Sequence, residues 1–128
     1  QVEALADETG VDVLGTVPDV RPYLDQAALV VTPLLVGGGT RIKIFEAMAM
    51  KKAVVSTSIG AEGLKVEDQK HILLADSVAE FANAVNQLLT SQEMRQQIGH
   101  AARTLVCEQF AAEPVARQFD AVCHEAVK

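Results

Sequence analysis

Two short apolar runs, separated by a stretch with helical spacing, constrain the fold of this chain most strongly. They are residues 29–32 and 53–57, and the helical stretch covers roughly residues 40–51. Strands that are apolar along their whole length are typical of a parallel sheet with helices on both faces. The sequence therefore predicts the α/β class, with a doubly wound parallel sheet.

The flanking segments extend the same alternation of helix and strand. We expect a helix over residues 2–9, a strand over Val11–Gly15, and a helix that opens at Pro18-Asp19 and runs to Ala27. A last strand is expected over residues 71–75. These elements form the α/β part of a single domain, residues 1–76.

From Ser77 onward the pattern predicts helices only. Ser77 is a suitable N-cap, because Glu80 stands three residues later as in a capping box. A second helix is expected after Ser91, and Pro114 suits the first turn of a third. Residues 77–128 are therefore predicted to be a C-terminal all-helical tail that packs on the α/β part.

Composition excludes several classes of protein. The formal net charge is −6, with no Trp and one Tyr among 128 residues, which disfavours a nucleic-acid partner. No run of about 18 apolar residues occurs, so we expect no membrane-spanning segment. Cys107 and Cys123 lack the spacing of a metal site and are interpreted as buried free thiols, which favours a cytoplasmic location.

Three consecutive glycines lead directly into the helix after the first apolar run. Gly37, Gly38 and Gly39 allow close approach of a ligand, and Thr40 can cap the helix or donate its hydroxyl to a phosphate. Arg41 and Lys43 place positive charge in the first turn, where an isolated helix favours acids. The pattern fits an anion site at a helix N-terminus, and the alternative is a flexible turn before an ordinary helix.

Glu46 lies on the same predicted helix and has two interpretations. On a helical wheel it borders a broad apolar surface that includes Ile42, while Ala47 falls with it on the other side. It could be a solvated carboxylate paired with Lys43. It could instead face the crevice and accept hydrogen bonds from sugar hydroxyls.

Taken in order, these segments resemble a known family. Residues 15–19 (GTVPD), residues 28–33 (ALVVTP), the stretch GGGTRIKIFEAMAM at residues 37–50, and residues 53–63 (AVVSTSIGAEG) are similar to the C-terminal domain of glycosyltransferase family 4. The members are retaining enzymes of GT-B architecture, and the match runs roughly from Val13 to Phe110. The resemblance implies a Rossmann-like domain that binds a nucleoside diphosphate sugar and needs no metal.

The resemblance also assigns donor-binding positions. Glu46 corresponds to the second Glu of the family motif and would contact the donor ribose. The loop from Gly37 to Arg41, which includes Gly38, Gly39 and Thr40, would lie near the diphosphate and the sugar, and the backbone at Val17 near the nucleobase. Gly38 stands where the family has its first Glu, so a carboxylate credited with contacting the donor sugar is missing.

We therefore expect the donor-binding part of a retaining glycosyltransferase that acts in glycan biosynthesis. The acceptor could be a glycan, a lipid-linked or a small molecule, and the full-length protein would be cytoplasmic or peripheral to the inner face of a membrane. The first strand of the domain and the acceptor domain are expected before Gln1, which predicts that these 128 residues alone are inactive. The alternative is a non-catalytic nucleotide- or anion-binding module.

Overall fold

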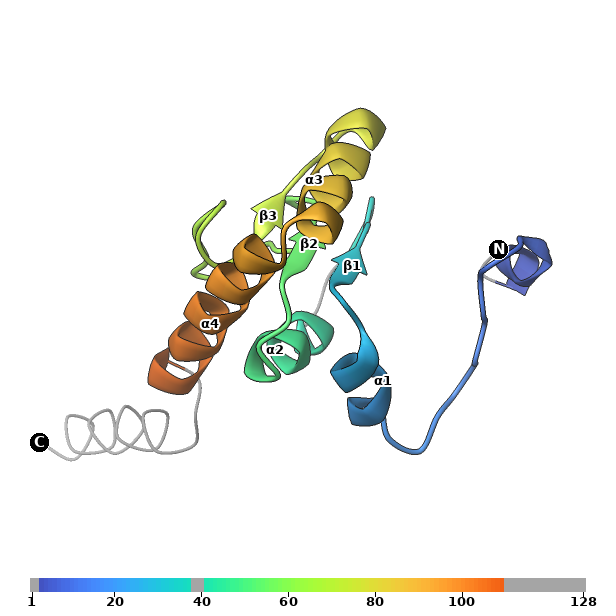
Figure 1. Cartoon of the computed structure of the whole chain (residues 1–128), viewed down its shortest axis with the longest axis horizontal. Helices are drawn as coiled ribbons and strands as arrows, with labels where there is room; N and C mark the ends of the chain where they lie inside the picture. Colours follow the sequence, from blue (N-terminus) through green and yellow to red (C-terminus); the bar gives the residue numbers. More distant parts are fainter. Residues whose placement is uncertain (1–2, 38–40, 110–128) are drawn as a thin grey trace, which may run out of the picture.

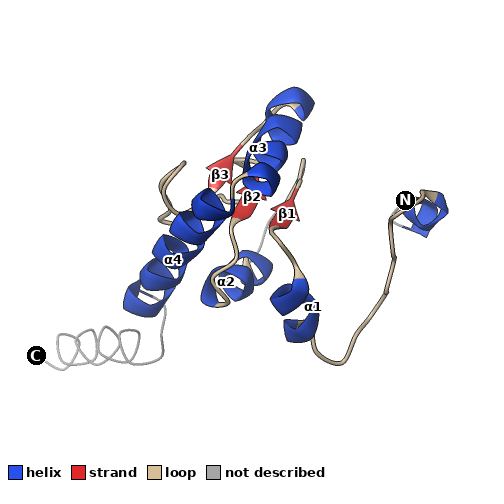
Figure 2. Ribbon diagram, viewed as in Figure 1, coloured by secondary structure: helices blue, strands red, loops and turns tan. Residues whose placement is uncertain are grey.

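The computed structural model describes residues 3–37 and 41–109. Helices and strands alternate over the first part of this range, and two helices follow the last strand (Figures 1 and 2). The elements are η1 (Glu3–Asp7), α1 (Arg21–Gln26), β1 (Val30–Thr32), α2 (Ile42–Ala49), β2 (Val54–Ser56), β3 (Leu73–Leu74), α3 (Val78–Thr90) and α4 (Gln92–Gln109).

The sheet is parallel, with the order β1-β2-β3. Val30 pairs with Val54, and Val55 pairs with Leu73. All three residues of β2 are buried, as expected for a central strand without a solvent-facing side. Because the strands are parallel, their carboxyl ends lie together at one edge of the sheet. The α/β class predicted from the apolar runs is thereby confirmed.

Alternate residues of β2 enter two separate cores, one on each face of the sheet. Val54 packs with Ile72 and the buried faces of α2 and α4. Val55 packs with Leu73 and the buried face of α3. Figure 1 shows α3 lying along the sheet, with α2 and α4 adjacent to each other. The sheet is thus covered by helices on both faces, as the doubly wound arrangement requires.

The predicted capping box starts α3. The Ser77 hydroxyl accepts a hydrogen bond from the Glu80 backbone N–H at 3.2 Å, and the Glu80 carboxylate accepts one from the Ser77 N–H at 3.1 Å. These contacts satisfy two amides that the helix itself leaves without partners. Hydrogen bonds from Ser77 therefore lower the pKa of the Glu80 carboxyl.

The N-terminal expectations are partly wrong. Val11–Gly15 forms no strand, and residues 3–7 form a 3₁₀-helix rather than an α-helix. Figure 1 shows this segment running away from the sheet, so no described strand lies beside it to pair with its backbone groups. The helix expected from Pro18 begins only at Arg21, because the Asp19 side chain accepts the Arg21 N–H at 2.9 Å.

Two further expectations concern the C-terminal part and the membrane. Cys107 is a free thiol but exposed rather than buried, because α4 packs through Ile98, Gly99, Ala102 and Leu105. The helix expected around Pro114 lies outside the described residues, and so does Cys123. Within residues 3–37 and 41–109, no helix has the length and apolar character needed to cross a membrane.

Candidate functional site

A cleft of about 470 Å³ opens at the carboxyl end of β1. In open α/β sheets this is the edge at which ligands bind. The end of β1, the loop after it, the first turn of α2 and the loop after β2 all contribute. Its lining residues are Val31, Thr32, Pro33, Leu34, Arg41, Ile42, Lys43, Ile44 and Gly60.

Arg41 is the central cation of this cleft. Its side chain is only 8% exposed, and its Nη2 donates a hydrogen bond to the Ile59 carbonyl at 2.8 Å. The Glu62 carboxylate lies 3.9 Å from the same nitrogen. The Nε atom is buried and has no hydrogen-bond partner among the described residues. A buried guanidinium with so few partners can accommodate an additional acceptor.

A second buried polar atom without a described partner belongs to Thr32, another residue of the cleft lining. The Thr32 hydroxyl is buried at the end of β1, while the Thr32 carbonyl accepts bonds from Leu34 N–H at 3.0 Å and Ser56 Oγ at 3.4 Å. Buried polar atoms are nearly always satisfied in folded proteins. Two such atoms in one cleft, on Thr32 and Arg41, therefore indicate a place for a polar ligand.

The loop after β2 is hydrogen-bonded to the loop after β1 through Thr57. Thr57 Oγ1 donates to the Leu34 carbonyl at 2.5 Å and accepts from the Gly60 N–H at 2.9 Å. A Cβ atom at Gly60 would clash with the Ser56 hydroxyl oxygen and would lie 3.0 Å from the Thr32 carbonyl oxygen, so only glycine fits here without a shift. These contacts position the Ile59 carbonyl that binds Arg41.

Asp76, after β3, anchors the same loop from its other side. Its two carboxylate oxygens accept hydrogen bonds from the Ser58 backbone N–H and hydroxyl, each at 2.7 Å. Both bonds lower the pKa of the Asp76 carboxyl, and the one from the Ser58 hydroxyl has the larger effect. The ends of all three strands are thereby tied together around the cleft.

The start of α2 favours an anion. Its first described turn contains no acid, and Arg41 at the N-cap makes no side-chain cap. The first N–H groups of a helix have no partner within the helix and carry a partial positive charge. Lys43, which is exposed and lines the cleft, adds a second cation beside Arg41.

The structure brings some of the predicted site residues together. A Cβ atom on Gly37 would lie 3.2 Å from Arg41 Nη1, so the glycine backbone packs against the guanidinium. Gly38, Gly39 and Thr40 fall outside the described residues. Val17 is half-buried in the segment before α1 and does not line the cleft. Its assignment to the nucleobase stays a prediction.

Glu46 lies on the exposed side of α2, about one turn beyond the cleft-lining Lys43. Within the described residues it forms no ion pair, so the pair with Lys43, one of the two interpretations of Glu46, is absent. The helical wheel misplaced two residues: Ala47, expected on the polar side, is fully buried, and Ile42, expected on the apolar surface, is 57% exposed. The helix buries the face of Ile44, Ala47 and Met48 because β2 and α4 pack there.

Sequence reasoning missed two contributors to this cleft. Thr32 was expected only as the end of a strand, and Gly60 was not assigned to a binding site, yet both line the cleft. A polar residue that ends an apolar strand directly before Pro33 could have indicated Thr32. No local pattern indicates Ile59, because its backbone carbonyl, rather than its side chain, binds Arg41.

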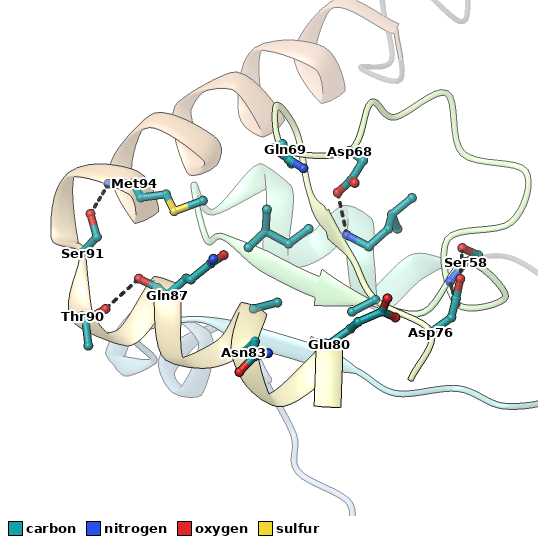
Figure 3. Close-up of a pocket in the computed structure, with 14 residues that line it drawn as sticks. Ser58, Asp68, Gln69, Asp76, Glu80, Asn83, Gln87, Thr90, Ser91 and Met94 are labelled. Atoms are coloured by element: carbon teal, nitrogen blue, oxygen red, sulfur yellow. Dashed lines mark hydrogen bonds between the residues drawn. The ribbon is translucent and has the colours of Figure 1, made fainter. Parts of the chain in front are cut away.

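A larger hollow of about 880 Å³ lies between β3, α3 and the start of α4 (Figure 3). Its carboxylates already bind backbone groups: Asp68 accepts the Leu74 N–H at 2.8 Å, while Asp76 and Glu80 hold Ser58 and Ser77. These acids therefore stabilise the fold. Within the described parts of the chain, no three His, Cys, Asp or Glu residues gather as a metal site would require.

Comparison with known proteins gives one match. Residues 1–91 match the family model described as "Glycosyl transferases group 1". This range includes the sheet, the cleft and all of α3. Neither a curated protein nor a solved structure matches the chain.

Proposed function

Because the chain belongs to the group 1 glycosyl transferases, we propose that its cleft binds a nucleoside diphosphate sugar, the donor of a retaining family 4 enzyme of GT-B architecture. The observation that carries this proposal is the Arg41 guanidinium, 8% exposed, with a buried and unpartnered Nε at the cleft. The guanidinium has five N–H donors, and its described partners are one backbone carbonyl at 2.8 Å and a carboxylate at 3.9 Å, which leaves donors for a ligand. A diphosphate supplies negative charge and several acceptor oxygens.

The transfer reaction uses the same positive groups. The bond between the anomeric carbon and the diphosphate oxygen breaks, and its electron pair leaves with the diphosphate. The acceptor hydroxyl oxygen bonds to the carbon, and the proton of that hydroxyl passes to the departing diphosphate. Negative charge therefore increases on the diphosphate as the bond breaks. Arg41, Lys43 and the first amides of α2 stabilise that charge without a metal ion.

The other donor contacts follow from the resemblance. Glu46 accepts hydrogen bonds from the ribose hydroxyls, and its position on the exposed side of α2 leaves its carboxylate accessible. Gly37, Gly38, Gly39 and Thr40 surround the diphosphate, and Val17 lies at the base. The acceptor is a glycan, a lipid-linked or a small molecule. The reaction belongs to glycan biosynthesis in the cytoplasm, or at the inner face of a membrane.

Calorimetric titration of nucleoside diphosphate sugars that differ in base and sugar tests the donor site on the full-length protein. The variant Arg41→Gln should weaken binding at least about tenfold, because charge-assisted hydrogen bonds contribute about 1.5–3 kcal/mol. Lys70→Gln is the matched control, since Lys70 is an exposed cation paired with Glu67 away from the cleft. Binding that is equal in the wild type and Arg41→Gln would refute the proposal.

A non-catalytic nucleotide- or anion-binding module remains the second candidate, and one observation favours it. The cleft lining contains two cations and, within the described residues, no acid or histidine. Such a lining suits binding of an anion but offers no group for proton transfer. Release of the nucleoside diphosphate from a bound donor, with or without an added acceptor, would decide for the enzyme.

A further inference from the structure

We propose that Glu62 is the built-in counter-ion of Arg41, and that the phosphate of a ligand must displace it to enter the cleft. Glu62 then limits the affinity of the cleft for anions, because its carboxylate competes with the ligand for the Arg41 guanidinium. This inference rests on the proposed anion site and adds a specificity-determining residue to it. The observations that carry it are the pairing of Arg41 and Glu62, their unequal burial, and the turn that connects them.

The turn after β2 fixes the backbone of Glu62 beside Arg41. The Ile59 carbonyl accepts two hydrogen bonds, one from Arg41 Nη2 at 2.8 Å and one from the Glu62 N–H at 3.3 Å. Arg41 and the Glu62 backbone therefore share one acceptor. The same turn is held at its start by Thr57 and Ser58, which bind Leu34 and Asp76.

The two partners differ in their freedom to move. The Arg41 side chain is 8% exposed, whereas that of Glu62 is 73% exposed. Their closest atoms are 3.9 Å apart, which is an ion-pair distance but too long for a hydrogen bond. The guanidinium thus stays in place while the carboxylate can rotate into solvent. In the described parts of the chain, no other acid pairs with Arg41.

This arrangement favours ligands of high charge. A carboxylate near an anion site lowers the positive potential that attracts the ligand. A diphosphate carries more charge and more acceptor oxygens than Glu62, so it replaces the carboxylate with a net gain in attraction. A singly charged anion that displaces Glu62 only replaces one ion pair of Arg41 with another of the same charge. Glu62 therefore raises selectivity for phosphates at the expense of affinity.

A calorimetric titration of the full chain with inorganic pyrophosphate tests the competition between Glu62 and the ligand. Glu62→Gln should tighten binding about two- to fivefold, the range expected for an exposed ion pair. Glu67→Gln is the matched control, since Glu67 is 67% exposed and pairs with Lys70. It removes the same charge and should leave the affinity unchanged. The gain should shrink at high salt.

A double-mutant cycle separates competition from a change in net charge. In the background of Arg41→Gln, the further change Glu62→Gln should have no effect on pyrophosphate binding. Equal or weaker binding by Glu62→Gln alone would overturn the inference and leave the anion site standing. If neither the wild type nor Glu62→Gln binds pyrophosphate, the anion site itself fails and the inference with it. Binding by Glu62→Gln alone would support both.

Discussion

Replacing Arg41 with Met tests whether this side chain serves a ligand or the fold. Methionine keeps an unbranched apolar stem, so the packing of the Arg41 methylenes is largely retained. The variant loses the hydrogen bond to the Ile59 carbonyl, worth about 1.5–3 kcal/mol for a charged donor. It also loses the loose pair with Glu62, worth at most about 1 kcal/mol because that carboxylate is 73% exposed.

The same change removes two costs. The guanidinium is 92% shielded from solvent, since its side chain is 8% exposed, and burial of an ion costs several kcal/mol. Its unpartnered Nε adds about 1–3 kcal/mol. The gains and losses therefore nearly cancel. We expect the free energy of unfolding of Arg41→Met to lie within about 1 kcal/mol of the wild type, or slightly above it.

Urea unfolding followed by circular dichroism measures this stability, and calorimetry with pyrophosphate measures the anion site. Arg41→Met should unfold near the wild-type midpoint and bind pyrophosphate at least about tenfold more weakly. Arg103→Met is the control, because Arg103 also donates to a backbone carbonyl, that of Ala49, away from the cleft. It should lose stability and keep its affinity. A loss above about 3 kcal/mol for Arg41→Met, with unchanged affinity, would refute the reasoning.

Three further predictions concern other parts of the structure. A Cβ atom at Gly99 would lie 2.8 Å from the Lys51 carbonyl carbon, so Gly99→Ala should separate α4 from α2 and cost about 2–3 kcal/mol in urea unfolding. Equal stability would show that the backbones relax freely. The pKa of Asp76 is lowered in the folded state by Ser58, so its stabilising effect is present above its unfolded pKa of about 3.9 and is lost as pH falls through the lower folded value. The stability difference between wild type and Asp76→Asn should therefore be constant above about pH 5 and shrink below about pH 4, whereas a pH-independent difference would contradict the linkage. Glu46→Ala should weaken donor binding about tenfold with little effect on folding, since Glu46 is exposed, and an unchanged KM and kcat in the full-length protein would remove it from the site.

Local patterns predicted the elements that form through near neighbours. The Ser77–Glu80 capping box is a contact between residues three apart, so the sequence alone located the start of α3. The apolar runs around Val30 and Val54 predicted parallel strands, because strands covered on both faces leave no polar positions. Burial on both faces holds for β2, whereas Val31 of the edge strand β1 is 44% exposed. The strand expected at Val11–Gly15 failed because a strand also needs a neighbour, which periodicity does not supply.

The site was only partly predictable for the same reason. The charge of Arg41 at the start of a helix was visible in the sequence, and it indicated an anion. The burial of Arg41 was not visible. Its bond to the Ile59 carbonyl and its pair with Glu62 join segments that are 18 or more residues apart in the sequence. Such contacts depend on the sheet bringing the loops after β1 and β2 together.

The sequence by itself determined the alternation of helix and strand, and with it the edge of the sheet where a ligand is expected. Only the tertiary structure decided how the helix ends are satisfied. None of α1, α2 and α3 has a basic residue in its own last turn. Lys52 donates to the Asp25 and Ala27 carbonyls, Arg103 to that of Ala49, and Arg95 to that of Leu88. Carbonyls at a helix C-terminus need donors, and here packing brings them from other segments, as it brings Glu62 to Arg41.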